Sequence, residues 1–150
     1  MNNVIKSLKF IYFLARYNPD KYPRVEIKDE FYKGLDNSKT QLRILSGLYG
    51  MLRPLDQIQP YRLEMGTKIS IGSNNDLYSF WKKKVTEQLK DELKKDELVV
   101  NLASREYFSV IDSDLISNTI VSPEFKDFKD GKLKIISFFA LTVINLLSFQ

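Results

Sequence analysis

Apolar residues follow helical spacing in two stretches near the start of the chain. They recur every three or four positions over residues 3 to 16, which is typical of an amphipathic helix that ends before Pro19. Similar spacing over residues 40 to 51 predicts a second helix, with Thr40 as its N-cap and Pro54 as its terminator. The sequence therefore predicts two helices separated by a polar, turn-rich segment.

The clearest amphipathic pattern covers residues 76 to 94. One apolar stripe runs along this segment, and lysines and glutamates occupy most other positions, as expected of a helix that covers a core. The nearly continuous apolar run 98 to 103 indicates a buried strand, which a turn or short helix from Ser104 follows. We expect this strand to be central and the long helix to pack on it through Phe80, Trp81, Val85 and Leu89.

Shorter segments predict the remaining strands. Residues 60 to 71 should be extended, and strands near 118 to 125 and 132 to 140 flank a KDGK loop that suits a hairpin. A chain of 150 residues is long enough for one domain and short for two. The mixture of helices and strands predicts an α/β (α+β) fold, a single domain in which helices pack on a mixed sheet.

The composition excludes several kinds of chemistry. The chain contains no cysteine and no histidine, which rules out disulfides, thiolate metal sites and histidine-based proton transfer. No spacing of carboxylates proposes a metal site, so neither a metal nor another cofactor is expected. No run of eighteen apolar residues predicts a membrane span, and no signal-peptide cleavage pattern follows the first apolar stretch. The net charge of +4 permits a phosphate-bearing partner without requiring one.

Residues 45 to 66, LSGLYGMLRPLDQIQPYRLEMG, combine turn-forming residues with charged side chains. Gly47 and Gly50 would each cost about 1 kcal/mol inside a helix. That cost is easiest to explain if another backbone or a ligand approaches them closely. Arg53 and Arg62 lie beside prolines, and an arginine on a rigid turn is well suited to bind an anion.

Two carboxylates accompany these arginines. Asp56 can cap the following amides or pair with Arg53, and Glu64 would share one face of a strand with Arg62. The alternate positions of that strand would face the core: Tyr61, Leu63 and Met65. We predict that Arg53 and Arg62 form an anion-binding pair that Asp56 or Glu64 orients. The alternative is a structural arginine–carboxylate pair that holds two loops together.

The segment LRILSGLYGMLRPLDQIQPYRLEMG closely resembles the signature of the YaaA family of bacterial peroxide stress proteins. The resemblance continues in family order through DLYSFWKKKVTEQL, VVNLASREYF and GKLKIISFFA, and it covers most of residues 41 to 140. It implies an unusual α/β fold with a helix-hairpin-helix element and a positively charged cleft, similar to DNA-binding proteins. It also implies a cytoplasmic protein, induced by hydrogen peroxide, that limits damage associated with free iron.

The chain departs from the family pattern in three places. The family's usual N-terminal strand, which resembles ISPAK, is absent, and NSKT replaces a longer acidic helical insert. The apolar ending LTVINLLSFQ stands where the family carries lysines and arginines. The resemblance therefore implies an incomplete YaaA-like domain over residues 1 to 150 that lacks its N-terminal strand. We expect residues 141 to 150 to pack poorly.

Two classes of function remain open, and the first is a DNA-binding stress protein. Backbone amides near a glycine turn and nearby basic side chains would hold the phosphate backbone. Binding of this kind tolerates any sequence and weakens as salt is added. The candidate residues are Gly47, Gly50, Arg53, Arg62 and Lys68.

The second class is an enzyme that acts on a nucleotide or nucleoside-like substrate. Polar residues follow the strand predicted at 98 to 103, where α/β proteins bind ligands, and carboxylates and arginines could move protons and hold phosphate. The candidate pocket residues are Arg53, Asp56, Arg62, Glu64, Asn101, Ser104 and Tyr107. For Asn101 and Ser104 the alternative is a satisfied strand end and a helix N-cap. Direct iron binding would rest on oxygen ligands alone, and no cluster of them is visible.

Overall fold

A computed structural model describes residues 8–14, 16–17, 41–54, 56–124, 126–129 and 132–135. For residues 8–14, 16–17, 126–129 and 132–135 it describes the course of the backbone, together with the side chain of Ile11. The predicted poor packing of residues 141 to 150 lies outside this part of the chain.

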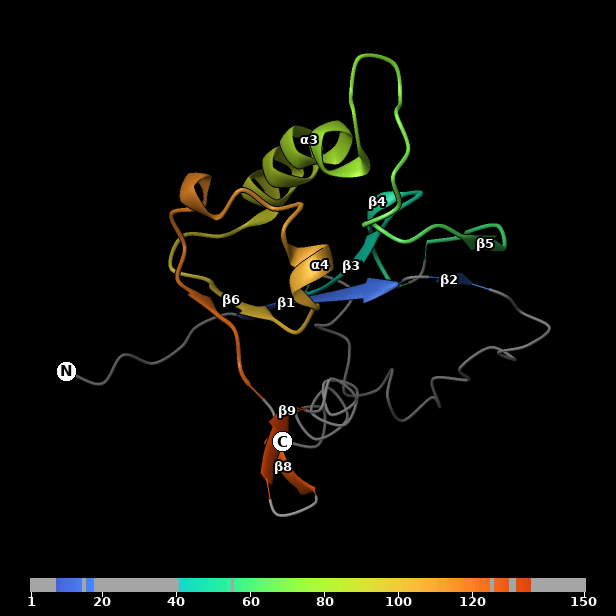
Figure 1. Cartoon of the computed structure of the whole chain (residues 1–150). Coiled ribbons are helices and arrows are strands. Elements are labelled where there is room, and N and C mark those ends of the chain that lie inside the picture. Colours follow the sequence, from blue (N-terminus) through green and yellow to red (C-terminus); the bar gives the residue numbers. More distant parts are fainter. Residues whose placement is uncertain are drawn as a thin grey trace.

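Five strands form one mixed sheet, which places three parallel strands at its centre (Figure 1). The strand β1 lies in the middle and pairs in parallel with β3 on one side and β6 on the other. The strand β7 extends the sheet in parallel beyond β6, and β4 closes the other edge in antiparallel pairing with β3. In the order β4-β3-β1-β6-β7 the bounds are Gly50–Leu52, Leu42–Ser46, Leu8–Leu14, Leu98–Asn101 and Ile120–Val121.

The long helix α3, Leu77–Glu92, confirms the strongest helix expected from the sequence. Asp76 is its N-cap and forms a capping box with Ser79, in which each side chain binds the other residue's backbone amide. The helix lies over one face of the sheet (Figure 1). Its apolar stripe enters the core through three fully buried side chains: Leu77, Val85 and Leu89.

Short elements complete the described fold. The helix α4, Arg105–Phe108, begins after Ser104 as expected, and the 3-10 helix η1 covers Ser113–Leu115. The strand β2, Arg16–Tyr17, pairs with β5, Tyr61–Arg62, in a separate two-stranded sheet. The strands β8, Lys126–Lys129, and β9, Lys132–Ile135, form a hairpin around the predicted KDGK loop, which stands apart from the main sheet in Figure 1. The first strand expected to flank this loop, near 118 to 125, instead contributes residues 120–121 to the main sheet, so the predicted pairing is wrong on that side.

The helix predicted over residues 3 to 16 is wrong for residues 8 to 14, which form the middle strand of the sheet. The sequence LKFIYFL is almost continuously apolar, as is typical of parallel strands covered on both faces. Such a run satisfies three- and four-residue spacing by coincidence. Ile11, the described side chain of this strand, is completely buried.

The helix predicted over residues 40 to 51 is also wrong. Residues 42 to 52 form an antiparallel hairpin of β3 and β4, in which Ser46 pairs with Gly50 and residues 47 to 49 make the turn. The backbone φ angle of Gly50 is +76°, in the left-handed region that glycine adopts at little cost. Gly47 therefore lies in the turn and Gly50 begins β4, so helix propensity does not decide their conformation.

The strand expected over residues 98 to 103 is present as β6 but lies next to the central position, which β1 occupies. Val99 is completely buried and shares the core with Val85 and Leu89 of α3, so the prediction is confirmed for these two helix residues. Trp81 instead contacts the hairpin turn at Gly47 and Gly50, and Phe80 does not belong to the buried core. Phe80 and Trp81 are half-buried.

Candidate functional site

The carboxyl ends of the parallel strands β1, β3 and β6 lie on the same side of the sheet, where α/β proteins place their ligands. Ser46 ends β3 and forms a 2.6 Å hydrogen bond between its hydroxyl and the hydroxyl of Tyr61. The backbone amide of Tyr49 donates to the same serine oxygen at 3.1 Å. The rings of Tyr49 and Tyr61 meet edge to face with centroids 5.5 Å apart. These contacts fix β5 against the hairpin turn.

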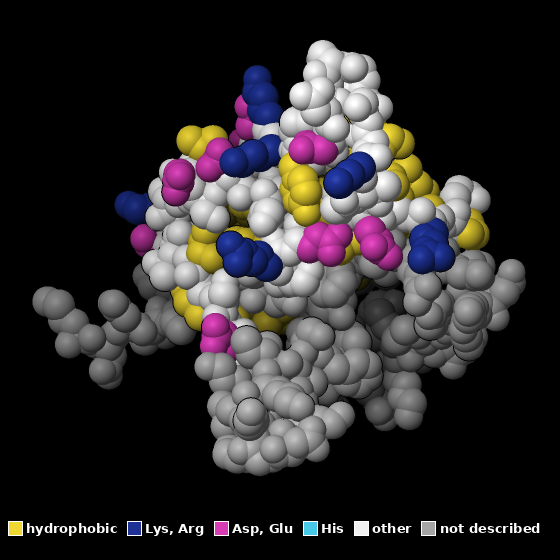
Figure 2. Space-filling model, viewed as in Figure 1, with side chains coloured by type: hydrophobic (Ala, Val, Ile, Leu, Met, Phe, Trp, Pro, Cys, Tyr) yellow, Lys and Arg dark blue, Asp and Glu magenta, His cyan; other side chains and the backbone are white. Residues whose placement is uncertain are grey.

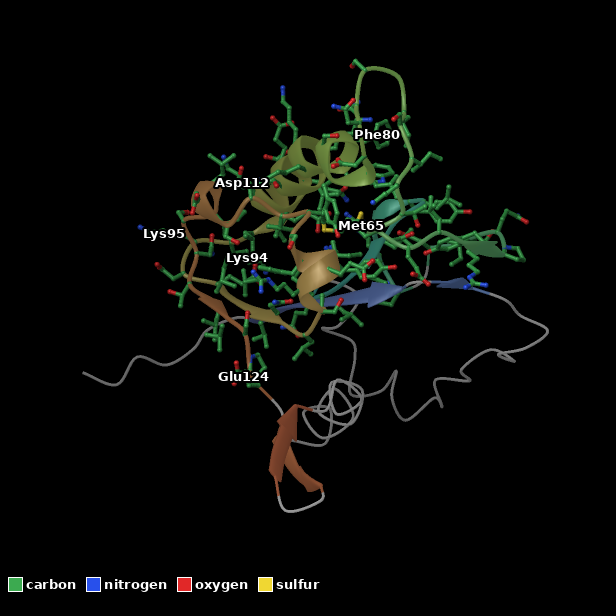
Figure 3. All side chains as sticks on the ribbon, viewed as in Figure 1. Met65, Phe80, Lys94, Lys95, Asp112 and Glu124 are labelled. Carbon is green, nitrogen blue, oxygen red and sulfur yellow. The ribbon has the colours of Figure 1, made fainter. Side chains whose placement is uncertain are left out.

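The residues after β5 pack against the same turn through close backbone contact. A Cβ atom at Gly47 would lie 2.5 Å from the carbonyl oxygen of Leu63, so only glycine fits there. This confirms the interpretation that a second backbone approaches this glycine. Met65 is completely buried and lies between α3 and α4 (Figure 3). The amide of Gly66 donates to a carboxylate oxygen of Glu106 in α4 at 2.8 Å.

Trp81 of α3 joins the hairpin turn to the helix. Its indole N–H donates to the carbonyl oxygen of Gly47 at 2.9 Å. A Cβ atom at Gly50 would lie 2.7 Å from the Trp81 ring, so this glycine also permits close approach. The close neighbours of both predicted glycines are thus parts of the protein itself.

The turn after β4 has the rigid geometry that the sequence predicts. The amide of Arg53 donates to the carboxylate of Asp56 at 2.7 Å, and the amide of Asp56 donates back to the carbonyl of Arg53 at 3.1 Å. Asp56 therefore pairs with the backbone of Arg53 and forms no salt bridge with its guanidinium group among the described contacts.

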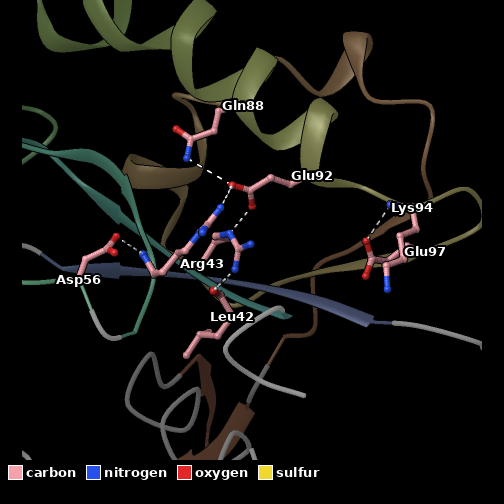
Figure 4. Close-up of polar contacts among 8 residues, drawn as sticks. Leu42, Arg43, Asp56, Gln88, Glu92, Lys94 and Glu97 are labelled. Atoms are coloured by element: carbon pink, nitrogen blue, oxygen red, sulfur yellow. Dashed lines mark hydrogen bonds and ion pairs between the residues drawn. The ribbon is translucent and has the colours of Figure 1, made fainter. Parts of the chain in front are cut away.

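The guanidinium group of Arg53 is held by a residue that sequence reasoning missed. Its Nη2 lies 3.2 Å from Oε1 of Glu92 on α3, and Oε2 of Glu92 accepts a short hydrogen bond from Nε of Arg43 on β3 (Figure 4). Arg43 also donates to the carbonyl of Leu42 at 2.7 Å, and Gln88 lies 3.4 Å from Oε1 of Glu92. The side chain of Arg43 is 4% exposed, that of Glu92 15% and that of Arg53 58%.

Electrostatics keep this shared carboxylate ionised. Burial alone would raise the pKa of Glu92, but the hydrogen bond and charge of Arg43, with further hydrogen bonds from Arg53 and Gln88, lower it below its usual range. We refer to Arg43, Glu92, Arg53 and Gln88 as the arginine cluster. An arginine in an apolar strand and a glutamate at the end of an amphipathic helix were the available sequence signals. Arg43 and Glu92 lie 49 positions apart, so no local sequence pattern predicts that they form a pair.

The other predicted anion-binding residues lie on the segment between β5 and α3. Arg62 and Glu64 are exposed, and the alternation with buried Met65 and half-buried Tyr61 and Leu63 confirms the predicted facing of this segment. Arg62 is the cross-strand partner of Arg16 in the pairing of β2 with β5. Lys68 is exposed in the loop that rises from the fold before α3 (Figure 1).

The predicted pocket residues after β6 have structural partners. Asn101 accepts a hydrogen bond from the amide of Ala103 at 2.9 Å and donates to the hydroxyl of Ser122 at 3.1 Å. Ser104 is the N-cap of α4 without a side-chain capping bond. These positions correspond to the alternative of a satisfied strand end and a helix start.

Tyr107 belongs to the core, with only 2% of its surface exposed. Burial raises the pKa of its hydroxyl to about 12, and a hydrogen bond with the backbone of Met65 opposes that increase. Glu106, and to a smaller extent Tyr61 and Glu64, repel the ionised form and raise the pKa further. The phenol is therefore protonated at neutral pH.

The predicted residues therefore occupy distinct places. Arg53 and Asp56 belong to the arginine cluster and its turn, Asn101 binds Ser122, and Tyr107 lies within the core. On the face shown in Figure 2, lysines and arginines lie among aspartates and glutamates instead of forming one continuous basic surface. Within the described residues, no group of three or more acidic side chains is arranged to hold a metal ion. None of the helices described is long and apolar enough to cross a membrane.

Comparison with known proteins identifies relatives of the chain. A family model described as peroxide stress protein YaaA matches residues 9–142. A UPF0246 protein of Flavobacterium johnsoniae is 53% identical over 124 residues, which are 83% of this chain and 49% of that protein. A UPF0246 protein of Flavobacterium psychrophilum is 57% identical over 121 residues, 74% of this chain and 48% of its own length. The chain thus spans about half the length of these curated relatives.

Proposed function

The chain belongs to the peroxide stress protein YaaA family, and we propose that it acts in the cytoplasmic response to hydrogen peroxide by binding DNA. In this proposal it contacts the phosphate backbone without reading sequence, and its presence limits iron-dependent damage to that DNA. The family assignment supports the peroxide response. The basic side chains between β4 and α3 support the DNA contact.

The observation that carries this proposal is the exposure of three cations on one fixed segment. Arg53, Arg62 and Lys68 are all exposed, and Arg62 and Lys68 form no salt bridge with the residues that the structure describes. The backbone around them is held by the Arg53–Asp56 turn, the Ser46–Tyr61 bond and the Gly66–Glu106 bond. Cations on a fixed backbone lose less entropy when they engage phosphates.

Salt dependence provides a direct test of the DNA contact. Each phosphate contact releases counterions, so the slope of log affinity against log salt should fall by about 0.9 per contact removed. We expect the Arg62→Ala, Lys68→Ala double variant to bind a short duplex more weakly and with a slope smaller by about 1–2. The Lys94→Ala, Lys95→Ala double variant provides the matched control, because it removes two exposed lysines after the end of α3 (Figure 3). An unchanged slope in the double variant would contradict the DNA contact.

The protective role requires a test in cells. Bacteria that lack their own family member should survive peroxide better when they produce this chain, and an iron chelator should abolish that difference. Equal survival with and without the chain, at matched expression, would remove the peroxide-protection part of the proposal and leave DNA binding to stand on the salt experiment.

A second candidate function is an enzyme that acts on a nucleotide-like substrate. The observation in its favour is the protonated, buried hydroxyl of Tyr107, which lies close enough to Tyr61 and Glu64 to interact with them electrostatically. A protonated phenol near a carboxylate can serve proton transfer. This function predicts that AMP or adenosine binds the chain and that Tyr107→Phe alters turnover more than affinity. Absence of nucleotide binding at millimolar concentration would exclude it.

A further inference from the structure

The arginine cluster contains two cations that share one carboxylate. Arg43 and Arg53 each carry one positive charge and Glu92 one negative charge, so the three ionised groups sum to +1. Asp56 lies nearby, but its carboxylate accepts from the backbone amide of Arg53 and makes no salt bridge to the guanidinium group among the described contacts. Among the three groups joined by these ion pairs one positive charge is in excess, and the carboxylate of Asp56 adds a negative charge on the backbone side of Arg53.

Burial decides where that charge is available. Arg43 is almost completely buried and is satisfied by Glu92 and the carbonyl of Leu42. Arg53 uses Nη2 to bind Glu92, while its other guanidinium N–H groups make no hydrogen bond within the described part of the chain. The Arg53 side chain is 58% exposed, so a ligand can reach it. The pair of Arg43 and Glu92 (Figure 4) therefore holds one side of the more exposed Arg53 guanidinium group.

We propose that the arginine cluster is a binding site for a single phosphate group, in which Arg53 makes the contact and Glu92, held by Arg43, is the positioning residue. A planar guanidinium group with free parallel donors matches the oxygens of phosphate. The inference deepens the proposed DNA-binding function, on which its choice of phosphate rests. It assigns to Arg53, one of the three exposed cations of that proposal, a phosphate contact that Glu92 of α3 positions.

Gln88 allows the charge of the cluster to be changed without removing any member of the ion pairs. Its amide lies 3.4 Å from the Glu92 oxygen that also binds Arg53, and its side chain is exposed. Gln88→Glu would add one negative charge to the cluster, and Gln88→Lys would add one positive charge. Ser117, which is exposed and lies outside the cluster, provides matched controls as Ser117→Glu and Ser117→Lys.

The experiment measures binding of inorganic phosphate to the whole chain by NMR titration of the Arg53 guanidinium and Gln88 amide signals. We expect Gln88→Glu to weaken binding and Gln88→Lys to strengthen it, each by about two- to fivefold, the range that exposed charge pairs produce. The Ser117 variants should change it much less, and Arg53→Ala should abolish it. Circular dichroism of each variant checks that the chain is folded.

The outcomes separate this site from the proposed function. If both Gln88 variants behave like their Ser117 counterparts, or Arg53→Ala binds phosphate normally, the site is wrong. If the Gln88 series shifts phosphate binding while a DNA duplex fails to bind, the site stands and the DNA-binding function fails. If DNA binds through Arg62 and Lys68 while neither Gln88 variant changes phosphate binding, the DNA-binding function stands and Arg53 serves only to hold the fold.

Discussion

At the scale of single residues, two glycines in left-handed conformation allow a paired experiment. Gly50 has φ +76° and would place a Cβ atom 2.7 Å from the Trp81 ring, whereas Gly72 has φ +59° and no atom within 4 Å of the same position. Gly50→Ala should therefore destabilise the chain by about 2–4 kcal/mol, from backbone strain and overpacking together. Gly72→Ala should cost about 1–2 kcal/mol, from the backbone alone. Equal losses in urea unfolding would contradict the contact with Trp81.

Glu92 makes the stability of the chain depend on acid. Its folded pKa is lower than the ordinary value of 4.5, so the ionised form stabilises the fold fully above pH 4.5. This contribution is lost as the pH falls through the folded pKa. Glu92→Gln should reduce the steepness of acid unfolding below pH 4.5, as followed by circular dichroism. It should also cost about 3–5 kcal/mol at neutral pH, because the buried Arg43 loses its counter-charge. Identical acid profiles would show that other carboxylates dominate.

At the scale of elements, Trp81 is the side chain that couples α3 to the hairpin turn. Trp81→Phe keeps an aromatic ring against Gly50 but removes the donor to the buried carbonyl of Gly47. The variant should lose about 1–3 kcal/mol, the cost of leaving a buried acceptor unpaired. Tyr78→Phe on the same helix is the control, because the Tyr78 hydroxyl makes no hydrogen bond to described residues, and it should change stability by less than about 0.5 kcal/mol. Both variants would be measured by thermal or urea unfolding. Equal losses of stability would contradict the role of the hydrogen bond between Trp81 and Gly47.

The elements also show where sequence reasoning succeeds. The helix expected over residues 76 to 94 forms as Leu77–Glu92, because sixteen residues of periodic pattern with an Asp76 cap admit no other regular structure. The hairpin at residues 42 to 52 was missed because its strands are only five and three residues long. Over such lengths helical and extended patterns coincide, and the left-handed angle at Gly50 decides the outcome.

The candidate site was predictable only in part, for a related reason. Local sequence identified the turn of Arg53 and Asp56 and the outward direction of Arg62 and Glu64, since both depend on neighbours within three positions. The partner of Arg53 was not predictable, because Glu92 lies 39 positions away and reaches it only through the packing of α3 on the sheet. Long-range ion pairs depend on topology, which a local pattern does not contain.

At the scale of the whole molecule, the position of β1 determines how the rest of the fold is held. It lies between β3 and β6, so its backbone groups pair on both sides, while β7 and β4 lie at the sheet edges. Amides of β1 should therefore exchange with solvent only on global unfolding, and those of β7 should exchange faster through local opening. If residues 8 to 14 formed the helix that the spacing of apolar residues predicts, their amides would be protected from exchange by bonds within the helix. That protection would not depend on β3 and β6.

A mutation at Ile11 tests the same arrangement energetically. Ile11 is completely buried in the middle strand and belongs to the same core as Leu45, Leu89 and Val99. Ile11→Ala should destabilise the chain by about 2–5 kcal/mol, because the surrounding rigid elements cannot collapse into the cavity. Val121→Ala on the edge strand β7, where the side chain is 43% exposed, should cost no more than about 0.5 kcal/mol. Hydrogen exchange of Ile11→Ala should lose protection in β3 and β6 together, because both pair with the strand that carries the mutation. Loss confined to residues 8 to 14 would mean that this strand folds onto an already stable sheet, and that its central position does not control the stability of the molecule.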